Sequence, residues 1–439
     1  MTVITRFPPS PTGFFHIGRA RTFLFNYLFT RQNGGKIVFR IEDTDKERSK
    51  IEYEKDIIDG LRWLGITWDN AVIARQSERN EIYKKYLQKI IADGNAYLSK
   101  ETPEKEGERA EVIRFKNPKK VVTFTDIIRG EVSFDTTDLG DFVIAKSLEE
   151  PIYHLSVVVD DFEMGVTHVI RGEDGISNTP RQILIQEAIE APRPLYAHVP
   201  LILAEDRSKL SARHGAVGVT EYRTKGYLPE AIINYLALLG WNPGTDQELF
   251  TLEELIGKFD LAKVQKGGAI FSEEKLRWVN KEYLKKAGVK AVIPYIPAEL
   301  TKGKSELQIQ ALAEMLLERI SVYGDMKTEL TAGEYDYLLK KPVYPKEMLR
   351  WKKAKSEPQE HLENVCSLVE KISPDAYTVS GIKEALFPYA EAKGKGDVLW
   401  PTRVALSGKE QSPDPFTLAA ILGKEETLAR LQSAVKLLG

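Results

Sequence analysis

A short stretch near the start of the chain carries side chains suited to binding charged and phosphorylated ligands. These residues are Arg6, Ser10, His16, Gly18 and Glu42, which offer a guanidinium, a hydroxyl, an imidazole, a compact backbone and a carboxylate. A helix is expected to begin near His16, and free backbone N–H groups at a helix start bind phosphate. The residue types therefore predict a crevice that holds a phosphate group.

The elements around these residues form a predicted β-α-β unit. Residues 2–7 are typical of a short buried strand, which ends at a pair of prolines because proline cannot continue a ladder. Apolar residues recur at helical spacing from His16 until residues 33–35, and residues 36–41 predict a second strand. Such units bind ligands beyond the carboxyl ends of their strands, which places the five residues around one crevice.

Two later segments predict further strands whose ends carry polar groups. Residues 151–161 form an apolar run that ends in two carboxylates, and we expect a buried strand there. Residues 167–170 predict the next strand, which Arg171 follows, and Pro180 lies in the first turn of the helix after it. Residues 198–203 predict a final strand before a charged loop.

Composition excludes several classes of protein. The 439 residues allow roughly three domains, and 42% apolar with 29% charged residues is ordinary for a globular protein. The single Cys366 excludes a disulfide within the chain and argues against a cysteine-ligated zinc site. No membrane span or signal peptide is recognisable, so we expect a cytoplasmic protein. A net charge of −2 does not exclude binding to nucleic acid, because local basic surfaces rather than the overall charge make contacts with phosphates.

Several motifs closely resemble glutamyl-tRNA synthetase of the bacterial type, a class I aminoacyl-tRNA synthetase. They are Pro-Ser-Pro-Thr-Gly at 9–13, His-Ile-Gly at 16–18, Arg-Ile-Glu-Asp-Thr-Asp at 40–45 and Arg-Gly-Glu-Asp at 171–174. The general class I pattern is His-Ile-Gly-His, and Arg19 stands in its fourth place. The resemblance extends over essentially the whole chain.

The resemblance implies an α/β fold, with a Rossmann-type catalytic domain that carries an α+β insertion and is followed by an all-α anticodon-binding region. The implied divisions are a catalytic domain (1–98 and 153–205), an inserted acceptor-end-binding subdomain (99–152), a signature loop with a helical stem-contact region (206–289) and a helical anticodon-binding domain (290–439).

The resemblance also implies a glutamate–tRNA ligase, which activates L-glutamate with ATP to glutamyl-adenylate and transfers it to the 3′ terminal ribose of tRNA(Glu). Implied catalytic residues are His16, Lys209 and Arg213; implied ATP-binding residues are Pro9, Ser10, His16, Gly18, Lys209, Ser211 and Arg213; implied glutamate-binding residues are Arg6, Ser10, Glu42, Tyr153 and Arg171. Mg²⁺ is expected to accompany ATP, no zinc is expected, and the protein is expected to be a monomer. Pairing of guanidinium with carboxylate would favour glutamate over glutamine.

One residue departs from the family pattern. Residues 209–215 read Lys-Leu-Ser-Ala-Arg-His-Gly, so Ala212 stands where the signature loop usually has a second lysine. Loss of one group that neutralises the triphosphate could cost about 3 kcal/mol of transition-state stabilisation. We expect Lys209 and Arg213 to compensate; an impaired enzyme, a chain altered at this position, and a non-catalytic RNA-binding paralogue are the alternatives.

Related enzymes fit the sequence less well. Glutaminyl-tRNA synthetase normally opens with Pro-Glu-Pro-Asn-Gly, unlike residues 9–13, and the tRNA-modifying glutamyl-queuosine relative lacks an anticodon domain, unlike residues 290–439. A small-molecule nucleotidyltransferase of the same superfamily would be indifferent to tRNA.

The densest basic stretch, residues 340–355, is interleaved with aromatic residues. Phosphate contacts combined with base stacking hold single-stranded RNA loops. The candidate tRNA-binding residues are Arg350, Trp351, Lys352 and Lys353, and a solvated basic helix face explains the stretch equally well.

Overall fold

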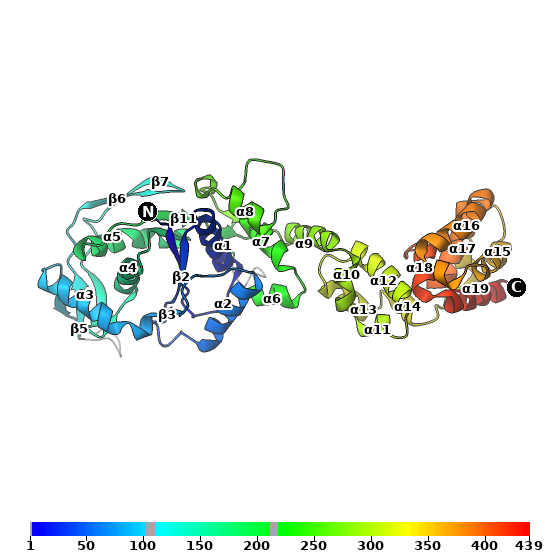
Figure 1. Ribbon diagram of the computed structural model, residues 1–439, viewed down its shortest axis with the longest axis horizontal. Coiled ribbons are helices and arrows are strands. Elements are labelled where there is room, and N and C mark those ends of the chain that lie inside the picture. The colour runs from blue at the N-terminus through cyan, green and yellow to red at the C-terminus, as the bar shows by residue number, and fades with distance from the viewer. Residues whose placement is uncertain (1, 102–109, 211–217) are drawn as a thin grey trace. The chain divides into compact units, whose positions relative to one another are not determined.

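The computed structural model describes residues 2–101, 110–210 and 218–439, which form two compact units (Figure 1). The first unit comprises residues up to Thr224 together with Pro229–Val279, and the second comprises Lys225–Leu228 and Asn280–Gly439. The division of the chain into four functional parts stays a prediction.

The β-α-β unit predicted at the start of the chain is confirmed. Strands β1 (Ile4–Phe7), β2 (Lys36–Ile41) and β3 (Ala74–Arg75) form a parallel sheet in that order, and helix α1 (Ile17–Gln32) joins the first two (Figure 1). Phe7 of β1 stacks on Phe23 of α1 with ring centroids 4.8 Å apart. This apolar contact fixes the helix on the sheet, and with it the turn that carries His16.

A second sheet has the order β10 (His168–Gly172), β11 (Leu195–Val199), β6 (Val121–Asp126) and β7 (Gly130–Asp135). Strands β10 and β11 are parallel, with Arg171 opposite His198. The hairpin β6–β7 joins this sheet by the single pair Tyr196–Asp126. Gly130 has a positive φ of 86° and ends the turn of this hairpin. This hairpin brings Asp126 next to β11.

The predicted insertion also contains an antiparallel sheet of β4 (Ala96–Lys100), β5 (Glu111–Phe115), β8 (Phe142–Ser147) and β9 (Glu150–Pro151).

The predicted buried strand at 151–161 is wrong, because most of that segment is helix α4 (Tyr153–Glu163). Its consecutive β-branched residues at 157–159 favour a strand by propensity, and burial of every residue from Leu155 to Asp161 removes the helical period from the sequence. The two carboxylates therefore lie in the last turns of a helix. The strand predicted at 198–203 is also divided, since Pro200 separates β11 from β12 (Ile202–Leu203).

The remaining elements of the first unit are helices around these sheets and one short strand. They are α2 (Ile51–Trp63), α3 (Asn80–Ala92), α5 (Thr179–Ala188), α6 (Val219–Thr224), α7 (Pro229–Leu238), α8 (Leu252–Lys258) and β13 (Ala269–Ile270), which pairs with β12. The boundary between the units falls within α9 (Glu273–Ala287). Pro180 lies in the first turn of α5, as predicted.

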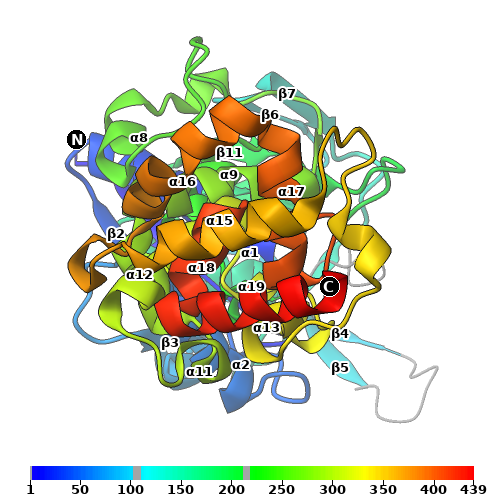
Figure 2. The same ribbon diagram turned by 90° about the vertical axis from the view of Figure 1, so that its right-hand side faces the viewer.

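The described residues of the second unit contain helices and no strand, as expected from the all-α region that the resemblance implied. Its helices are α10 (Val289–Val292), α11 (Ala298–Thr301), α12 (Glu306–Arg319), α13 (Gly324–Thr331), α14 (Asp336–Leu339), α15 (Pro358–Glu370), α16 (Val379–Lys393), α17 (Lys395–Ser407), α18 (Pro415–Leu422) and α19 (Lys424–Leu438). Helices α15 and α19 pack side by side (Figure 2).

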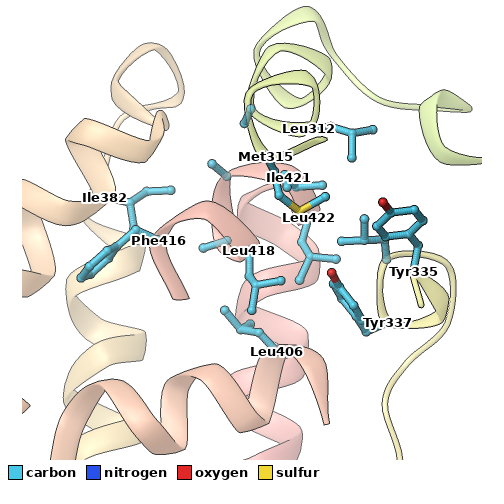
Figure 3. Close-up of a cluster of buried hydrophobic side chains, with 14 of the residues drawn as sticks. Leu312, Met315, Tyr335, Tyr337, Ile382, Leu406, Phe416, Leu418, Ile421 and Leu422 are labelled. Atoms are coloured by element: carbon cyan, nitrogen blue, oxygen red, sulfur yellow. The ribbon is translucent and has the colours of Figure 1, made fainter. Parts of the chain in front are cut away.

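The core of the second unit is made of apolar side chains from several of these helices. Met315 of α12 lies beside Ile421 and Leu422 of α18, and Leu418 of α18 lies beside Leu406 of α17 (Figure 3). Burial of one such side chain contributes roughly 1.5–3 kcal/mol. Amphipathic spacing therefore accounts for these helices without any functional role.

Candidate active site

A cavity of about 780 Å³ lies in the first unit, beyond the carboxyl ends of β1, β2 and β10. All predicted ATP- and glutamate-binding residues that the structure describes line it: Arg6, Pro9, Ser10, His16, Gly18, Glu42, Tyr153, Arg171 and Lys209. The predicted Ser211 and Arg213, like Ala212, lie outside the described residues. The fold thus gathers side chains from positions 6 to 209 around one space.

His16 forms the start of α1 and faces the cavity. Its Nδ1 accepts a hydrogen bond from the backbone N–H of Arg19 at 3.3 Å. A side chain at Gly18 would begin 3.2 Å from that same Nδ1, so glycine leaves room for the ring. Burial lowers the pKa of His16 to about 4, and the cations Arg19 and Lys209 add to this effect. The neutral imidazole therefore carries its proton on Nε2, where it can donate to a phosphate oxygen.

Three cationic side chains surround the same part of the cavity. Arg19 donates from Nη1 to the backbone oxygen of Ser10 at 3.2 Å, and burial lowers its pKa. Arg21 donates to the backbone oxygens of Leu239 and Pro200. Lys209 is largely exposed and its Nζ lies 4.0 Å from a carboxylate oxygen of Asp174. Lys209 therefore keeps the freedom to reach a bound anion, and Arg19 is a cavity cation that the sequence marked only as a departure from the family pattern.

The opposite wall rests on a buried network of ion pairs. Arg6 donates from Nε to Asp161 at 3.3 Å. Arg40 is fully buried, and its Nη2 lies 3.0 Å from Asp161 and 2.8 Å from Glu42. Asp160 accepts hydrogen bonds from three further side chains, those of Gln76, Arg79 and Tyr83. The network holds Arg6 and Glu42 in fixed positions at the cavity.

The pKa values of Glu42 and Arg40 are both raised, but for different reasons. Burial raises the pKa of the Glu42 carboxyl, although the Arg40 guanidinium opposes the effect. The pKa of Arg40 is raised, since the attraction of Asp161 and Glu42 exceeds the effect of burial. Arg40 was not among the predicted site residues. Its position in β2, two residues before Glu42 at the end of that strand, is the signal that could have identified it.

Arg171 reaches the cavity from the end of β10. Its Nε lies 3.1 Å from Nε2 of His198, and its Nη2 donates to the hydroxyl of Thr179 at 2.8 Å. Its Nη1 is buried and has no hydrogen-bond partner among the described residues. A side chain at Gly175 would begin 2.8 Å from Nε, so glycine is required beneath the guanidinium. Two nitrogens of Arg171 are therefore held by neighbouring side chains, and the third has no partner among the described residues.

Tyr153, the first residue of α4, also lines the cavity. Its side chain is 38% exposed, so its hydroxyl is accessible to a bound molecule. Its place at the start of a helix, rather than near the start of a strand as predicted, is what directs the ring to the cavity.

The predicted tRNA-binding residues lie in the second unit, just before α15. Lys352 and Lys353 are exposed, and Arg350 forms an exposed ion pair with Glu357 at 3.3 Å. The Trp351 ring is half-buried and covers Gly396, where a side chain would begin 2.3 Å from the ring. The lysines are accessible to an anion, while one part of the indole is occupied by α17.

Within residues 2–101, 110–210 and 218–439, no group of three or more histidine, cysteine, aspartate or glutamate side chains is placed to hold a metal ion. None of the helices in that part of the chain is both long enough and apolar enough to cross a bilayer.

Burial raises the pKa of the Cys366 thiol to about 11.

Comparisons with known proteins match nearly the whole chain. The family model for the catalytic domain of class I tRNA synthetases (E and Q) matches residues 2–109 and 99–278, and a model for an anticodon binding domain matches 271–435. Glutamate–tRNA ligase of Carboxydothermus hydrogenoformans is 39% identical, over 98% of this chain and 99% of the relative. The relative of that name from Aquifex aeolicus is 40% identical, over 98% of both chains. A solved glutamate tRNA ligase from Elizabethkingia meningosepticum, in complex with its amino acid, is 32% identical with a TM-score of 0.88 and covers 100% of both chains.

Proposed function

This chain belongs to the class I tRNA synthetases of the glutamate and glutamine group, and from that membership we propose that it is an ATP-dependent glutamate–tRNA ligase. The full-length similarity to relatives that bear this name supports the assignment, and these relatives give no support to a non-catalytic RNA-binding protein. The observation that carries the substrate is the presence of Arg171 and Arg6 in the lining of one cavity, where two guanidinium groups can pair with carboxylates.

Glutamate is held between the two walls of the cavity. Arg171 and Arg6 bind its carboxylates, and Tyr153 contributes a hydroxyl. Glu42, fixed by Arg40, and Ser10 bind the amino end. A carboxamide gives Arg171 a weaker, uncharged acceptor, and an incompletely satisfied buried guanidinium disfavours glutamine.

ATP enters as its Mg²⁺ complex with its phosphates at the start of α1. Nε2–H of His16 and the backbone N–H groups near Gly18 donate to phosphate oxygens, while Lys209 and Arg213 approach as cations. A carboxylate oxygen of glutamate attacks the α-phosphorus, and pyrophosphate leaves with the bonding electron pair. A ribose hydroxyl of the tRNA end then attacks the acyl carbon, and AMP leaves.

Arg19 supplies part of the positive charge that Ala212 removes from the signature loop. It lines the cavity beside His16, and its guanidinium is held by the Ser10 carbonyl at 3.2 Å. A buried cation fixed in this way neutralises phosphate charge with little reorganisation.

tRNA(Glu) is the partner of the second unit. The matching anticodon-domain model and the accessible Lys352 and Lys353 support contact there with phosphates. We place the protein in the cytoplasm, where charged tRNA is used, and as a monomer.

Glutamate-dependent exchange between ATP and pyrophosphate, measured with and without tRNA(Glu), tests this function. Exchange with glutamate and not with glutamine is expected, followed by glutamylation of the tRNA. Absence of exchange in both conditions, with tRNA(Glu) still bound, would overturn the proposal in favour of the non-catalytic RNA-binding alternative.

A further inference from the structure

A chain of hydrogen bonds runs behind Arg171, away from the cavity. His198 is fully buried, and its Nε2 lies 3.1 Å from Nε of Arg171. Nδ1 of the same ring lies 2.7 Å from Oδ2 of Asp126, which is also fully buried at its side chain. The three residues stand on adjacent strands β10, β11 and β6 of one sheet.

The chemistry of the groups determines where the proton lies. Nε of a guanidinium can only donate, so Nε2 of His198 must accept from Arg171. The imidazole proton is therefore on Nδ1 and is donated to Asp126. Burial lowers the pKa of His198, and the Asp126 hydrogen bond opposes this effect without reversing it, which is consistent with a neutral ring.

Asp126 is itself held firmly at the end of β6. Its Oδ1 accepts from the backbone N–H groups of Ile128 and Arg129 at 2.9 Å each, and its Oδ2 also accepts from the backbone N–H of His198 at 3.0 Å. The carboxylate thus has fixed donors in the hairpin turn and in β11. It can only orient the imidazole in one way.

The guanidinium of Arg171 is consequently held on two sides and left open on the third. His198 fixes Nε, Thr179 fixes Nη2, and Gly175 packs beneath Nε. Nη1 is buried and has no partner among the described residues, and the Arg171 side chain lines the cavity. A proton on Nε2 of His198 would face the Nε–H of Arg171, and this hydrogen bond would be lost. The direction in which Nη1 points therefore depends on the tautomer of His198.

We propose that Asp126 and His198 are positioning residues that orient Arg171 for the carboxylate of glutamate, and that they thereby set glutamate affinity and discrimination against glutamine. The inference rests on the proposed function of the cavity. Asp126 comes from the segment predicted as the acceptor-end insertion, so a residue outside the β-α-β framework determines the geometry of the amino-acid site.

Three variants test the inference. Asp126→Asn keeps the shape but offers an N–H to Nδ1, which favours the wrong tautomer; His198→Leu removes the acceptor from Arg171. Both should raise KM for glutamate about tenfold or more, with kcat at saturating glutamate and KM for ATP changed by less than about threefold. His198→Gln should recover part of the affinity because its side-chain oxygen can accept from Arg171.

Asp141→Asn is the matched control. Asp141 is another carboxylate of the insertion that accepts a backbone N–H, from Asn117 at 2.9 Å, and a hydroxyl, from Tyr97 at 2.9 Å, but it does not line the cavity. This variant should change thermal stability without raising KM for glutamate. The inference is overturned if Asp126→Asn and His198→Leu lower stability but leave KM for glutamate within about twofold of the wild type.

Direct titration of glutamate into the full-length protein with tRNA(Glu) separates this inference from the proposed function. Wild-type protein that binds glutamate without catalysing exchange would reject the ligase assignment, and the same titration of the variants would still decide the inference. Equal binding by wild type, Asp126→Asn and His198→Leu would overturn it.

Discussion

Two arginines, one in each unit, differ in how their guanidinium groups are held in the cavity wall and in the helical core. Arg430 of α19 is fully engaged in the second unit, where Nη1 donates to the backbone oxygens of Tyr337 and Leu406 at 2.6 Å each and Nε pairs with Glu426 at 2.8 Å. Arg171 of the first unit has two nitrogens held and leaves Nη1 buried without a partner. Arg430 is therefore tied into its unit by all three guanidinium nitrogens, whereas Arg171 lines the cavity with one nitrogen that has no partner among the described residues.

The environments of the two arginines differ in the same way. The walls of the cavity rest on ion pairs such as Arg40 with Asp161, whereas the second unit is dominated by apolar contacts between α12 and α18. A buried ion pair contributes little net stability but holds charged groups in place. Fixed charges therefore hold the polar groups of the cavity in place, although the first unit also has an apolar core of its own.

Substitution of Arg171 gives the largest expected effect and tests the ligand side of this comparison. Arg171→Ala should lower kcat/KM for glutamate about a thousandfold, equivalent to about 4 kcal/mol, because the guanidinium–carboxylate pair is lost. Its thermal stability should change little, since the removed group was incompletely paired. Pyrophosphate exchange and calorimetry measure both. Normal charging of tRNA by this variant would remove Arg171 from the site.

Substitution of Arg430 should give the opposite result. Arg430→Met leaves the carbonyls of Tyr337 and Leu406 without their donor, and we expect a loss of about 2–4 kcal/mol in the free energy of unfolding. The rate of exchange between ATP and pyrophosphate, a reaction that does not include transfer to tRNA, should remain near that of the wild type. Chemical denaturation and glutamate binding distinguish the two results. A large loss of glutamate affinity with unchanged stability would contradict the structural role.

A double substitution sharpens the assignment of charge within the cavity. Arg19→Gln should lower exchange activity about tenfold, because one cation near the phosphates is lost. Adding Ala212→Lys to that variant should restore most of the activity, whereas Ala212→Lys alone should have a smaller effect. KM for ATP and kcat measure the change. Equal responses to Ala212→Lys in both backgrounds would show that Arg19 and position 212 act independently.

The smallest expected effect is a dependence of stability on pH. The pKa of His16 is about 4 in the folded protein, whereas the unfolded chain has the ordinary value of 6.5. Between pH 4 and pH 6.5 the unfolded chain therefore binds a proton at His16 that the folded chain does not. The stability of the wild type should therefore fall as pH falls from 6.5 towards 4. His16→Asn should show a shallower fall in denaturation at pH 7 and pH 5, and identical slopes would contradict the lowered pKa.

The sequence by itself determined the local features of this protein. The turn from β1 into α1, the helices of the second unit and the residues Arg6, His16 and Arg171 follow from short motifs and helical spacing. These features are local because a turn, a helix start or an amphipathic helix depends on residues a few positions apart.

The tertiary structure decided which buried groups are partnered. Residues 153–163 form a helix, whereas the sequence alone favoured a strand there. The strand was predicted because burial of consecutive residues from Leu155 to Asp161 hides the helical period in the sequence. Asp126 and His198 are 72 positions apart, and Arg6 and Asp161 are 155 apart. No periodic pattern connects such distant residues, since hydrogen-bond partners in a core are chosen by the packing of strands and helices in space.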